Sequence, residues 1–410
     1  MPESRRAPID HTGSIPGRIP RGVWMLGFVS MCMDLSSELI HSLLPLYMAI
    51  GLGASTLTIG IVEGIAEATA MIVKLFSGVL SDFFRRRKAL VVVGYGLAAL
   101  TKLVFPLAPT LGWVVAARFA DRVGKGIRGA PRDALIADLA PPELRGRSFG
   151  LRQALDTVGA VGGPLLAIGA MAYFASDFQA AFWVAVVPAF LCVVLLVLGV
   201  EEPSAQAKAS SSEGRKLRLG DARRLGRRYA AVVAIAAVLT LARFSEAFLV
   251  LRAQDVGLPA AMAPWVMVVM AIVYAAVAYP AGSAVDRGHG LRLLSAGCLA
   301  LIAADLVLAN AAGAATVSVG AALWGLHMGL TQGLLAALVA ATVPADLRGT
   351  AFGVFNLVCG IALLAASVLA GWLWDTFGPD FTFYAGAVLT LIAWIALARH
   401  GPAAIEPGHA

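Results

Sequence analysis

Long apolar segments recur twelve times along this chain of 410 residues, and they constrain its fold more than any other feature. Each is close to the length of about 20 apolar residues that a helix needs to cross a bilayer. Their residues do not alternate between polar and apolar, as the strands of a membrane β-barrel would. The sequence therefore predicts an all-α membrane protein with spans at 23–48, 57–80, 89–107, 111–138, 148–173, 179–200, 229–253, 260–283, 291–311, 314–341, 350–375 and 380–399.

The composition supports lipid as the solvent. Hydrophobic residues make up 59% of the chain and charged residues only 14%, whereas soluble domains carry about 25% charged residues. The net charge of +7 does not indicate nucleic acid, because the basic residues gather in alternate loops. They occur in the first 21 residues, in RRRK at 85–88 and in the segment 201–228, and the intervening loops contain no Lys or Arg. This pattern predicts cytoplasmic termini in a multi-pass protein of a bacterial inner membrane.

Two sequence motifs occur twice with a similar separation of about 200 residues. PPELRGRSFG at 141–150 is matched by PADLRGTAFG at 344–353, and GVLSD at 78–82 is matched by GSAVD at 282–286. The repeats predict two pseudo-symmetric six-helix halves at 22–200 and 229–399. A cytoplasmic tail at 1–21, a cytoplasmic linker at 201–228 and a tail at 400–410 complete the chain. Parallel repeats of this kind place a substrate site between the halves.

GVLSDFFRRRK at 78–88 resembles the signature loop of the major facilitator superfamily, with matches at Gly78, Asp82, Arg86 and Arg87. Phe83 and Arg85 depart from that pattern. The second copy keeps Gly282, Asp286 and Arg287. RVGKGIRGA at 122–130 resembles the superfamily's helix-4 motif, with Lys125 in place of glutamine. GAVGGPLLAI at 159–168 resembles the helix-5 motif of its proton-driven exporters, with matches at Gly159, Gly163 and Pro164.

The resemblance implies a transporter fold and roles for these motifs. Asp82, Arg86 and Asp138 would form a charged latch between the halves on the cytoplasmic side, with Gly282, Asp286 and Arg287 as its second copy. The helix-5 motif would take part in conformational switching. Two simpler readings stay open: the basic loop only fixes the topology, and the glycines only allow close helix packing.

Charged residues are concentrated on the fourth predicted span. At about 100° per residue, they fall within an arc of about 120°, and a charge facing lipid would cost at least about 2.5 kcal/mol. They are Arg118, Asp121, Arg122, Lys125, Arg128 and Arg132. The five basic residues of this set, with Lys74 and Arg152, make seven cations. They balance seven acids in the same half: Asp34, Glu38, Glu63, Glu67, Asp121, Asp133 and Asp156.

This balance allows two interpretations. One is a self-neutralised structural network. The other is proton coupling, in which a cavity carboxylate alternates between an ion pair and a protonated state. For that role we expect Asp34 and Glu38 on the first span, paired with Arg122, with Asp156 and a possible relay through His41.

The second half carries fewer charges, and this asymmetry predicts that it shapes the substrate pocket. The candidate cavity residues from both halves are Arg118, Lys125, Arg243, Glu246, His327, Gln332 and Asn356.

The resemblance implies a secondary transporter that works by alternating access, with proton coupling and export favoured. Import of a nutrient, an organic anion or a metal chelate is the close alternative, and a membrane sensor or membrane enzyme is the alternative from another class. The sequence has no HExxH, DDxxD or P-loop motif, so we expect no enzyme activity, metal or cofactor.

The expected partners are a small-molecule substrate, protons and the bilayer, with no nucleic acid. The protein is expected to be a monomer. The four cysteines lack paired spacing and are predicted to be packing residues.

Overall fold

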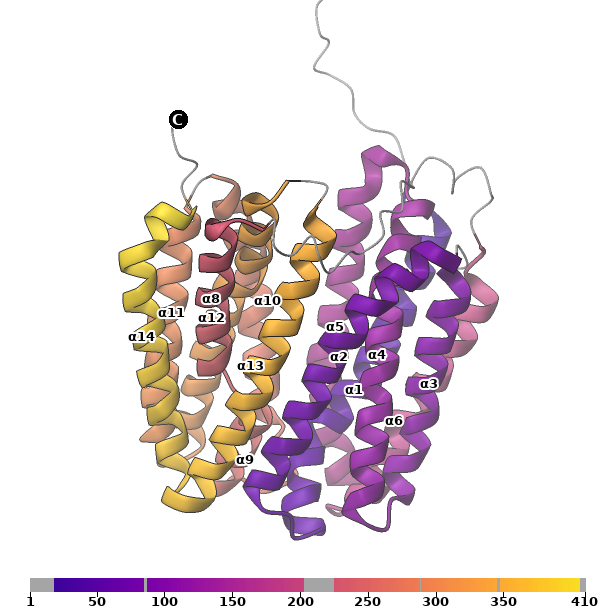
Figure 1. The fold of residues 1–410 in the computed structure, drawn as a ribbon. Helices are drawn as coiled ribbons and strands as arrows, with labels where there is room; N and C mark the ends of the chain where they lie inside the picture. The colour runs from indigo at the N-terminus through magenta and orange to yellow at the C-terminus, as the bar shows by residue number, and fades with distance from the viewer. Residues whose placement is uncertain (1–17, 85–86, 203–224, 288, 345–346, 406–410) are drawn as a thin grey trace, which may run out of the picture.

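The computed structural model describes residues 18–84, 87–202, 225–287, 289–344 and 347–405, and this part of the chain is helical with short connections (Figure 1). The tail at 1–17 and most of the predicted linker lie outside the described residues. The first group of helices comprises α1 (Arg21–Leu46), α2 (Thr56–Phe84), α3 (Arg87–Leu107), α4 (Leu111–Leu139), α5 (Arg145–Tyr173) and α6 (Phe178–Gly199). The second comprises α8 (Arg227–Ala242), α9 (Ala247–Asp255), α10 (Trp265–Asp286), α11 (Gly290–Ala309), α12 (Ala314–Thr342), α13 (Arg348–Phe377) and α14 (Pro379–Ile405).

The all-α prediction is confirmed, and each of the twelve predicted spans coincides with helix to within a few residues at most ends. Within the described residues, nine segments are long and apolar enough to cross a membrane by length and composition alone. The spans that fall outside this set include α2 and α4, which carry the charged residues discussed above. All four cysteines are free and buried, as expected for packing residues.

The seventh span differs from its prediction. The sequence suggested one helix over 229–253, but the chain leaves the helix between α8 and α9, at 243–246. The backbone N–H of Ser245 donates to Ser367 Oγ of α13 at 3.3 Å, and Ser245 Oγ accepts from the N–H of Ala247 at 3.3 Å. Non-helical backbone is tolerated at membrane depth only where protein or a wet cavity satisfies it, and here a neighbouring helix does so.

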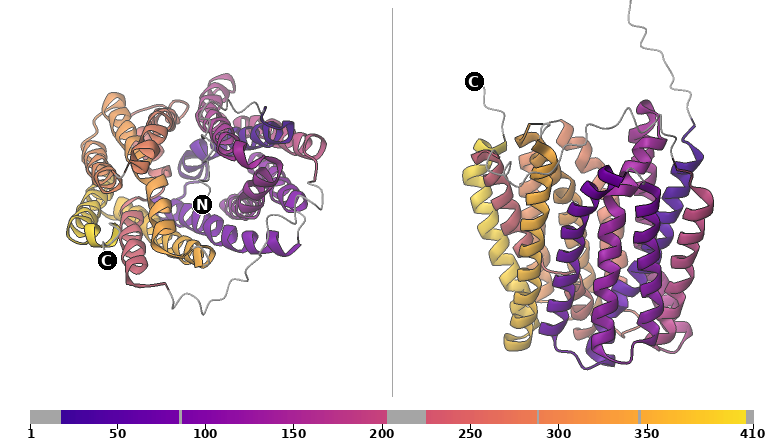
Figure 2. Two further views of the ribbon diagram at one scale, coloured as in Figure 1. Left: turned by 90° about the horizontal axis from the view of Figure 1, so that it is seen from above. Right: turned by 45° about the vertical axis from the view of Figure 1, so that its right-hand side comes forward.

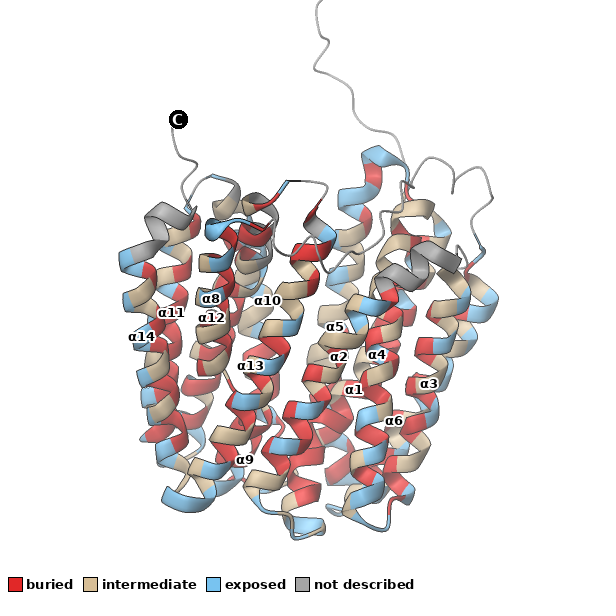
Figure 3. Cartoon of the chain, viewed as in Figure 1, coloured by how far each residue is buried: buried red, intermediate tan, exposed pale blue. Residues whose placement is uncertain are grey.

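Seen from above, α1–α6 (the N-terminal group) lie largely on one side and α8–α14 (the C-terminal group) on the other (Figure 2). The start of α1 and the end of α14 lie at the same end of the bundle, which we call the terminal end; the opposite end is the far end. Buried residues follow the inward faces of the helices (Figure 3).

The apolar core changes character along the bundle axis. At the far end one cluster joins both groups, with Leu43 and Phe182 packed in the same core as Phe248 and Trp324. Toward the terminal end the core splits into two clusters, one built around Leu26 and other residues of the N-terminal group and the other from the C-terminal group. The two groups therefore share apolar packing at the far end and pack separately at the terminal end.

Small residues set how closely the groups approach along α2 and α13. A Cβ on Gly60 would collide with the backbone carbonyl of Ser367, and one on Gly371 would collide with the backbone of Thr56. Nearer the terminal end, a Cβ on Gly360 would find only ordinary contacts at 3.5 Å and beyond. A Cβ on Gly353, nearer still to the terminal end, would collide with the side chain of Leu75. The backbones of the two groups thus come closest at the far end, where glycine lets them touch.

Candidate functional site

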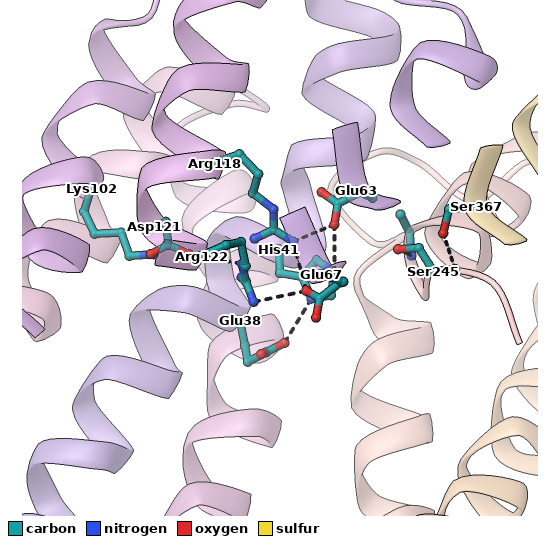
Figure 4. Close-up of polar contacts among 11 residues, drawn as sticks. Glu38, His41, Glu63, Glu67, Lys102, Arg118, Asp121, Arg122, Ser245 and Ser367 are labelled. Atoms are coloured by element: carbon teal, nitrogen blue, oxygen red, sulfur yellow. Dashed lines mark hydrogen bonds and ion pairs between the residues drawn. The ribbon is translucent and has the colours of Figure 1, made fainter. Parts of the chain in front are cut away.

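A chain of buried ion pairs begins between α2 and α4 (Figure 4). Arg118 donates to Glu63 at 2.5 Å, and Arg122 donates to Glu67 at 3.1 Å. The side chains of Arg118 and Glu63 are at most 1% exposed. The two helices can approach this closely because Gly126 of α4 lies against the side chain of Val73, where a Cβ would not fit, and against the carbonyl of Ala70.

The chain of ion pairs continues into α3 through Lys102, a residue that the sequence did not suggest. Lys102 donates to Asp121 at 2.8 Å, and Asp121 also lies 3.3 Å from Arg122 Nε. Lys102 is 1% exposed. The sequence count of balancing charges omitted Lys102, although a lone lysine inside an apolar span is itself a signal of a buried acidic partner.

At its other end, the chain of ion pairs reaches Glu38 and His41 of α1. His41 Nδ1 lies 3.4 Å from Glu38, and His41 Nε2 lies 3.6 Å from Glu63. The path from Glu38 to Lys102 therefore joins α1, α2, α4 and α3 without a break longer than 4 Å. Glu38 and Glu67 are its more accessible members, with side chains 24% and 23% exposed.

Among the described residues, Arg122 makes no direct contact with the predicted acids of α1, although Glu38 is one of its electrostatic neighbours. Arg122 contacts Glu67 and Asp121 instead, because the charged face of α4 packs along α2 and α3. In the described part of the chain, Asp34 makes no hydrogen bond or ion pair within 4 Å. Its electrostatic neighbours are Asp156 and the cations Arg128, Arg132 and Lys125.

The helix-5 motif lies directly against the predicted proton-coupling residues. A Cβ on Gly159 would meet the backbone of Met31 and the Cβ of Asp34, and one on Gly163 would meet the Cβ of Glu38. Close packing of α5 on α1 is therefore established, and it occurs at Asp34 and Glu38.

A second polar cluster lies nearer the terminal end of the N-terminal group. Arg152 contacts Asp156 at 2.6 Å and reaches Asp133 at 4.0 Å. Arg132 contacts the same Asp133 at 3.1 Å and donates to Ser30 of α1 at 2.7 Å. This cluster joins α1, α4 and α5, so Asp156 belongs to a different group of contacts from Glu38.

The predicted cavity residues divide into two sets. Arg118 and His327 are 1% and 2% exposed, and His327 Nδ1 lies 2.9 Å from the carbonyl of Gly297, so neither is accessible in this conformation. Lys125 is exposed. The remaining candidates are half-buried and make no direct hydrogen bond or ion pair within the described residues: Arg243, Glu246, Gln332 and Asn356.

Only part of the predicted latch is described. Asp138 accepts from Arg87, which also donates to the carbonyl of Ala134 at 3.4 Å. Arg86 and the surroundings of Gly78, Asp82 and Asp286 lie outside the described side chains, while Gly282 and Arg287 are exposed.

A contact that the sequence did not suggest joins the groups at the far end. Asp375 of α13 accepts from the backbone N–H groups of Thr56 at 3.0 Å and Leu57 at 2.8 Å, at the start of α2. A carboxylate at a helix N-terminus satisfies free donors and complements the helix dipole.

Comparisons with known proteins agree with this architecture. The sequence model of the Major Facilitator Superfamily matches residues 26–366 and 235–408. An MFS-type transporter of Methanocaldococcus jannaschii is 33% identical over 391 residues, which cover 92% of this chain and 94% of the relative. The inner membrane transport protein YajR of Escherichia coli is 25% identical over 92% of this chain and 82% of its own length.

Solved structures of low identity share the fold. A POT family transporter superposes with a TM-score of 0.78 at 12% identity, covering 94% of this chain and 97% of its own. The nucleoside transporter NupG superposes with a TM-score of 0.75 at 14% identity, covering 92% and 99%. The chain is thus a multi-pass transporter of the cell membrane and not an enzyme. It belongs to the major facilitator superfamily.

Proposed function

We propose that this protein is a proton-coupled secondary transporter that moves a small solute by alternating access, with export as the favoured direction. The observation that carries the proposal is the chain of ion pairs from Glu38 to Lys102. It is buried over most of its length, yet two of its carboxylates, Glu38 and Glu67, are partly accessible.

Protonation of an accessible member would change the contacts of the buried ones. If Glu38 takes up a proton, His41 loses its charged partner on α1 and keeps only Glu63. Because Glu63 also holds Arg118, the change is passed to α4. A proton can drive transport only if the two conformations bind it with different affinity, and such a rearrangement of contacts supplies the difference. Asp156, which contacts Arg152 in the second cluster, would act in the same way. Asp34, which has no direct contact, would act through its electrostatic neighbours Asp156, Arg128 and Arg132.

We further propose that the two helix groups are the pseudo-symmetric halves of the transporter and that the terminal end is cytoplasmic. The basic residues of alternate loops support this orientation. The shared core and the Asp375 contact at the far end, together with the split core at the terminal end, support a conformation open to the cytoplasm. In the reversed conformation we expect the Asp375 contact to be broken and the predicted latch at Asp82, Arg86 and Asp138 to join the two groups.

Export is supported by two likenesses. The helix-5 motif resembles that of proton-driven exporters, and a multidrug resistance protein MdtH of Photorhabdus laumondii is 29% identical over 164 residues, 40% of this chain. The proton-coupled importer is the competing direction.

The test uses sealed proteoliposomes containing a pH-sensitive dye. A panel of organic anions, organic cations and neutral nutrients is added to wild type, Asp34→Asn, Glu38→Gln and the exposed control Glu143→Gln. We expect at least one class to move protons in wild type and the control but not in the two network variants. Proton influx with solute uptake would support import, and opposite fluxes would support export. Solute flux without proton movement would refute the coupling.

A further inference from the structure

A pocket of about 320 Å³ lies between α10 and α12 in the C-terminal group. Its wall includes Tyr274 and Ala278 of α10 and Met328 and Gly333 of α12, and no charged side chain lines it. Added Cβ atoms on Gly282 and Gly333 would meet nothing within 4 Å, so both glycines border open space. The pocket is near the lower limit of volume for small-ligand sites and suits an apolar or aromatic body.

Two residues of the pocket wall, Tyr274 and Met328, pack in the far-end core that joins the two groups, together with Phe244, the neighbour of Arg243. Tyr274 has Arg243 and Glu246 as electrostatic neighbours, and also Arg152 of α5 in the other group. His327, beside Met328 on α12, also has Arg243 as an electrostatic neighbour. Both walls of the pocket are therefore within electrostatic reach of Arg243.

Arg243 is a cation without a direct partner. It lies at the end of α8, where the seventh span is broken, and it is half-buried. Among the described residues, no acid lies within 4 Å of it. Glu246, three positions later, has His41, Arg243, Glu38 and Glu67 as electrostatic neighbours. It makes no ion pair with Arg243 within 4 Å, so the guanidinium can contact another anion.

Lys125, the exposed cation of the N-terminal group, does not compete with Arg243 for an anionic ligand. Lys125 of α4 has Asp34, Glu38 and Glu67 as electrostatic neighbours. Lys125 can thus be balanced by carboxylates of its own group, whereas no acid among the described residues contacts Arg243 within 4 Å. A partly desolvated guanidinium favours a planar anion that can accept two hydrogen bonds.

We infer that the cargo is an amphipathic organic anion, whose carboxylate or sulfonate binds Arg243 while its apolar body fills the pocket between α10 and α12. This inference rests on the proposed function as a small-molecule transporter and adds the substrate class. An organic cation in the same pocket would be repelled by Arg243.

The test measures binding of 2-naphthoate to the full chain in lipid nanodiscs by equilibrium dialysis. The neutral 2-naphthamide and the cation 2-naphthylmethylammonium serve as ligands of the same size. Arg243→Gln removes the charge, and Gly333→Leu fills the pocket without a backbone clash. Arg292→Gln, an exposed position on α11, is the matched control.

We expect 2-naphthoate to bind wild type and the control more tightly than the neutral and cationic ligands do. Each of the two site variants should weaken its binding by about tenfold or more, the cost of losing a charge-assisted hydrogen bond or the apolar pocket. Equal binding of the amide, unchanged binding in Arg243→Gln and Gly333→Leu, or no binding at millimolar concentration would each overturn the inference.

Proton flux in the same preparation separates this inference from the proposed function. If 2-naphthoate binds as expected but moves no protons, the anion site stands and proton coupling fails. If an organic cation moves protons while 2-naphthoate does not bind, the coupling stands and the anion site fails.

Discussion

The two helix groups bury charge in opposite ways. In the N-terminal group, Arg118, Arg122 and Lys102 each contact a carboxylate on another helix. In the C-terminal group, the fully buried Asp305 of α11 has no hydrogen-bond partner for either carboxylate oxygen in the described structure. The buried Arg252 donates to the carbonyls of Leu308 and Ala309 at 3.0 and 2.9 Å, and it also contacts two partly exposed acids at the surface.

The difference indicates a division of labour. An ion pair between helices can be rearranged by a proton, because its strength depends on the charge of both partners. Arg252 is held by backbone carbonyls as well as by Asp255 and Asp380. Because the carbonyls do not titrate, Arg252 keeps its contacts with the end of α11 even when those two acids are protonated. We therefore assign proton coupling to the N-terminal group and solute recognition to the C-terminal group.

The largest expected effect is on Arg118. Arg118→Met leaves the buried Glu63 with His41 as its remaining contact, at 3.6 Å, and breaking a buried ion pair costs about 3–5 kcal/mol. Thermal unfolding of purified protein should show a large loss of stability, with Arg292→Gln unchanged. The double variant Arg118→Met with Glu63→Leu should recover most of that loss. A single variant as stable as wild type would show that the network is not buried as described.

A smaller effect is expected for Arg252. Arg252→Met leaves carbonyls at the end of α11 without their donor, and each unsatisfied buried group costs about 1–3 kcal/mol. Stability should fall in the same unfolding assay. Proton movement per solute should stay at the wild-type value, and a changed ratio would contradict the division between the groups.

Asp375 offers a test of the seam between the groups. Asp375→Ala removes a helix N-terminal cap that is worth about 0.5–2 kcal/mol, which corresponds to a shift of roughly twofold to thirtyfold between conformations. Spin labels attached at Ile50→Cys and Phe377→Cys, two exposed positions near the far end, would report the distance between the helix groups by double electron–electron resonance. We expect a larger population of long distances in the variant. An unchanged distance distribution would show that the Asp375 contact does not hold the two groups together at the far end.

The smallest effect is expected for Asp305. No donor or cation contacts its carboxylate in the described structure, so Asp305→Asn breaks no ion pair. Its stability should differ from wild type by less than about 1 kcal/mol, within the range of substitutions that break no interaction. Asp121→Asn, which loses the Lys102 contact, is the paired comparison and should be clearly less stable. Equal losses in both would mean that Asp305 has a charged partner.

The sequence predicted the spans well because the apolar runs are long and their ends are marked by polar loops. It did not predict the break at 243–246, since LARFSE contains neither proline nor glycine and the break depends on Ser367, far along the chain. Helical spacing correctly grouped the charges of α4 on one face. It could not tell which neighbouring helix that face meets, so Arg122 was assigned to Asp34 and Glu38 instead of Glu67.

Other contacts escaped prediction because they join distant parts of the chain. The Asp375 cap joins residues more than 300 positions apart, and an aspartate beside a surface loop gives no local sign of its partner. Lys102 was missed because only residues on the charged stripe and its expected partners were counted. The motif residues Gly159 and Gly163 were found from their spacing, but only the structure shows them against Asp34 and Glu38.

The measurement that tests the division of labour most directly compares two transport modes in the same proteoliposomes. One is accumulation driven by an imposed pH gradient, and the other is exchange at equal pH, both for the compound that moves most protons in wild type. The account predicts that Glu38→Gln loses gradient-driven accumulation by about tenfold or more and keeps exchange, while Asp305→Asn keeps both. Gradient-driven accumulation that survives in Glu38→Gln but is lost in Asp305→Asn would contradict the account and move proton coupling to the C-terminal group.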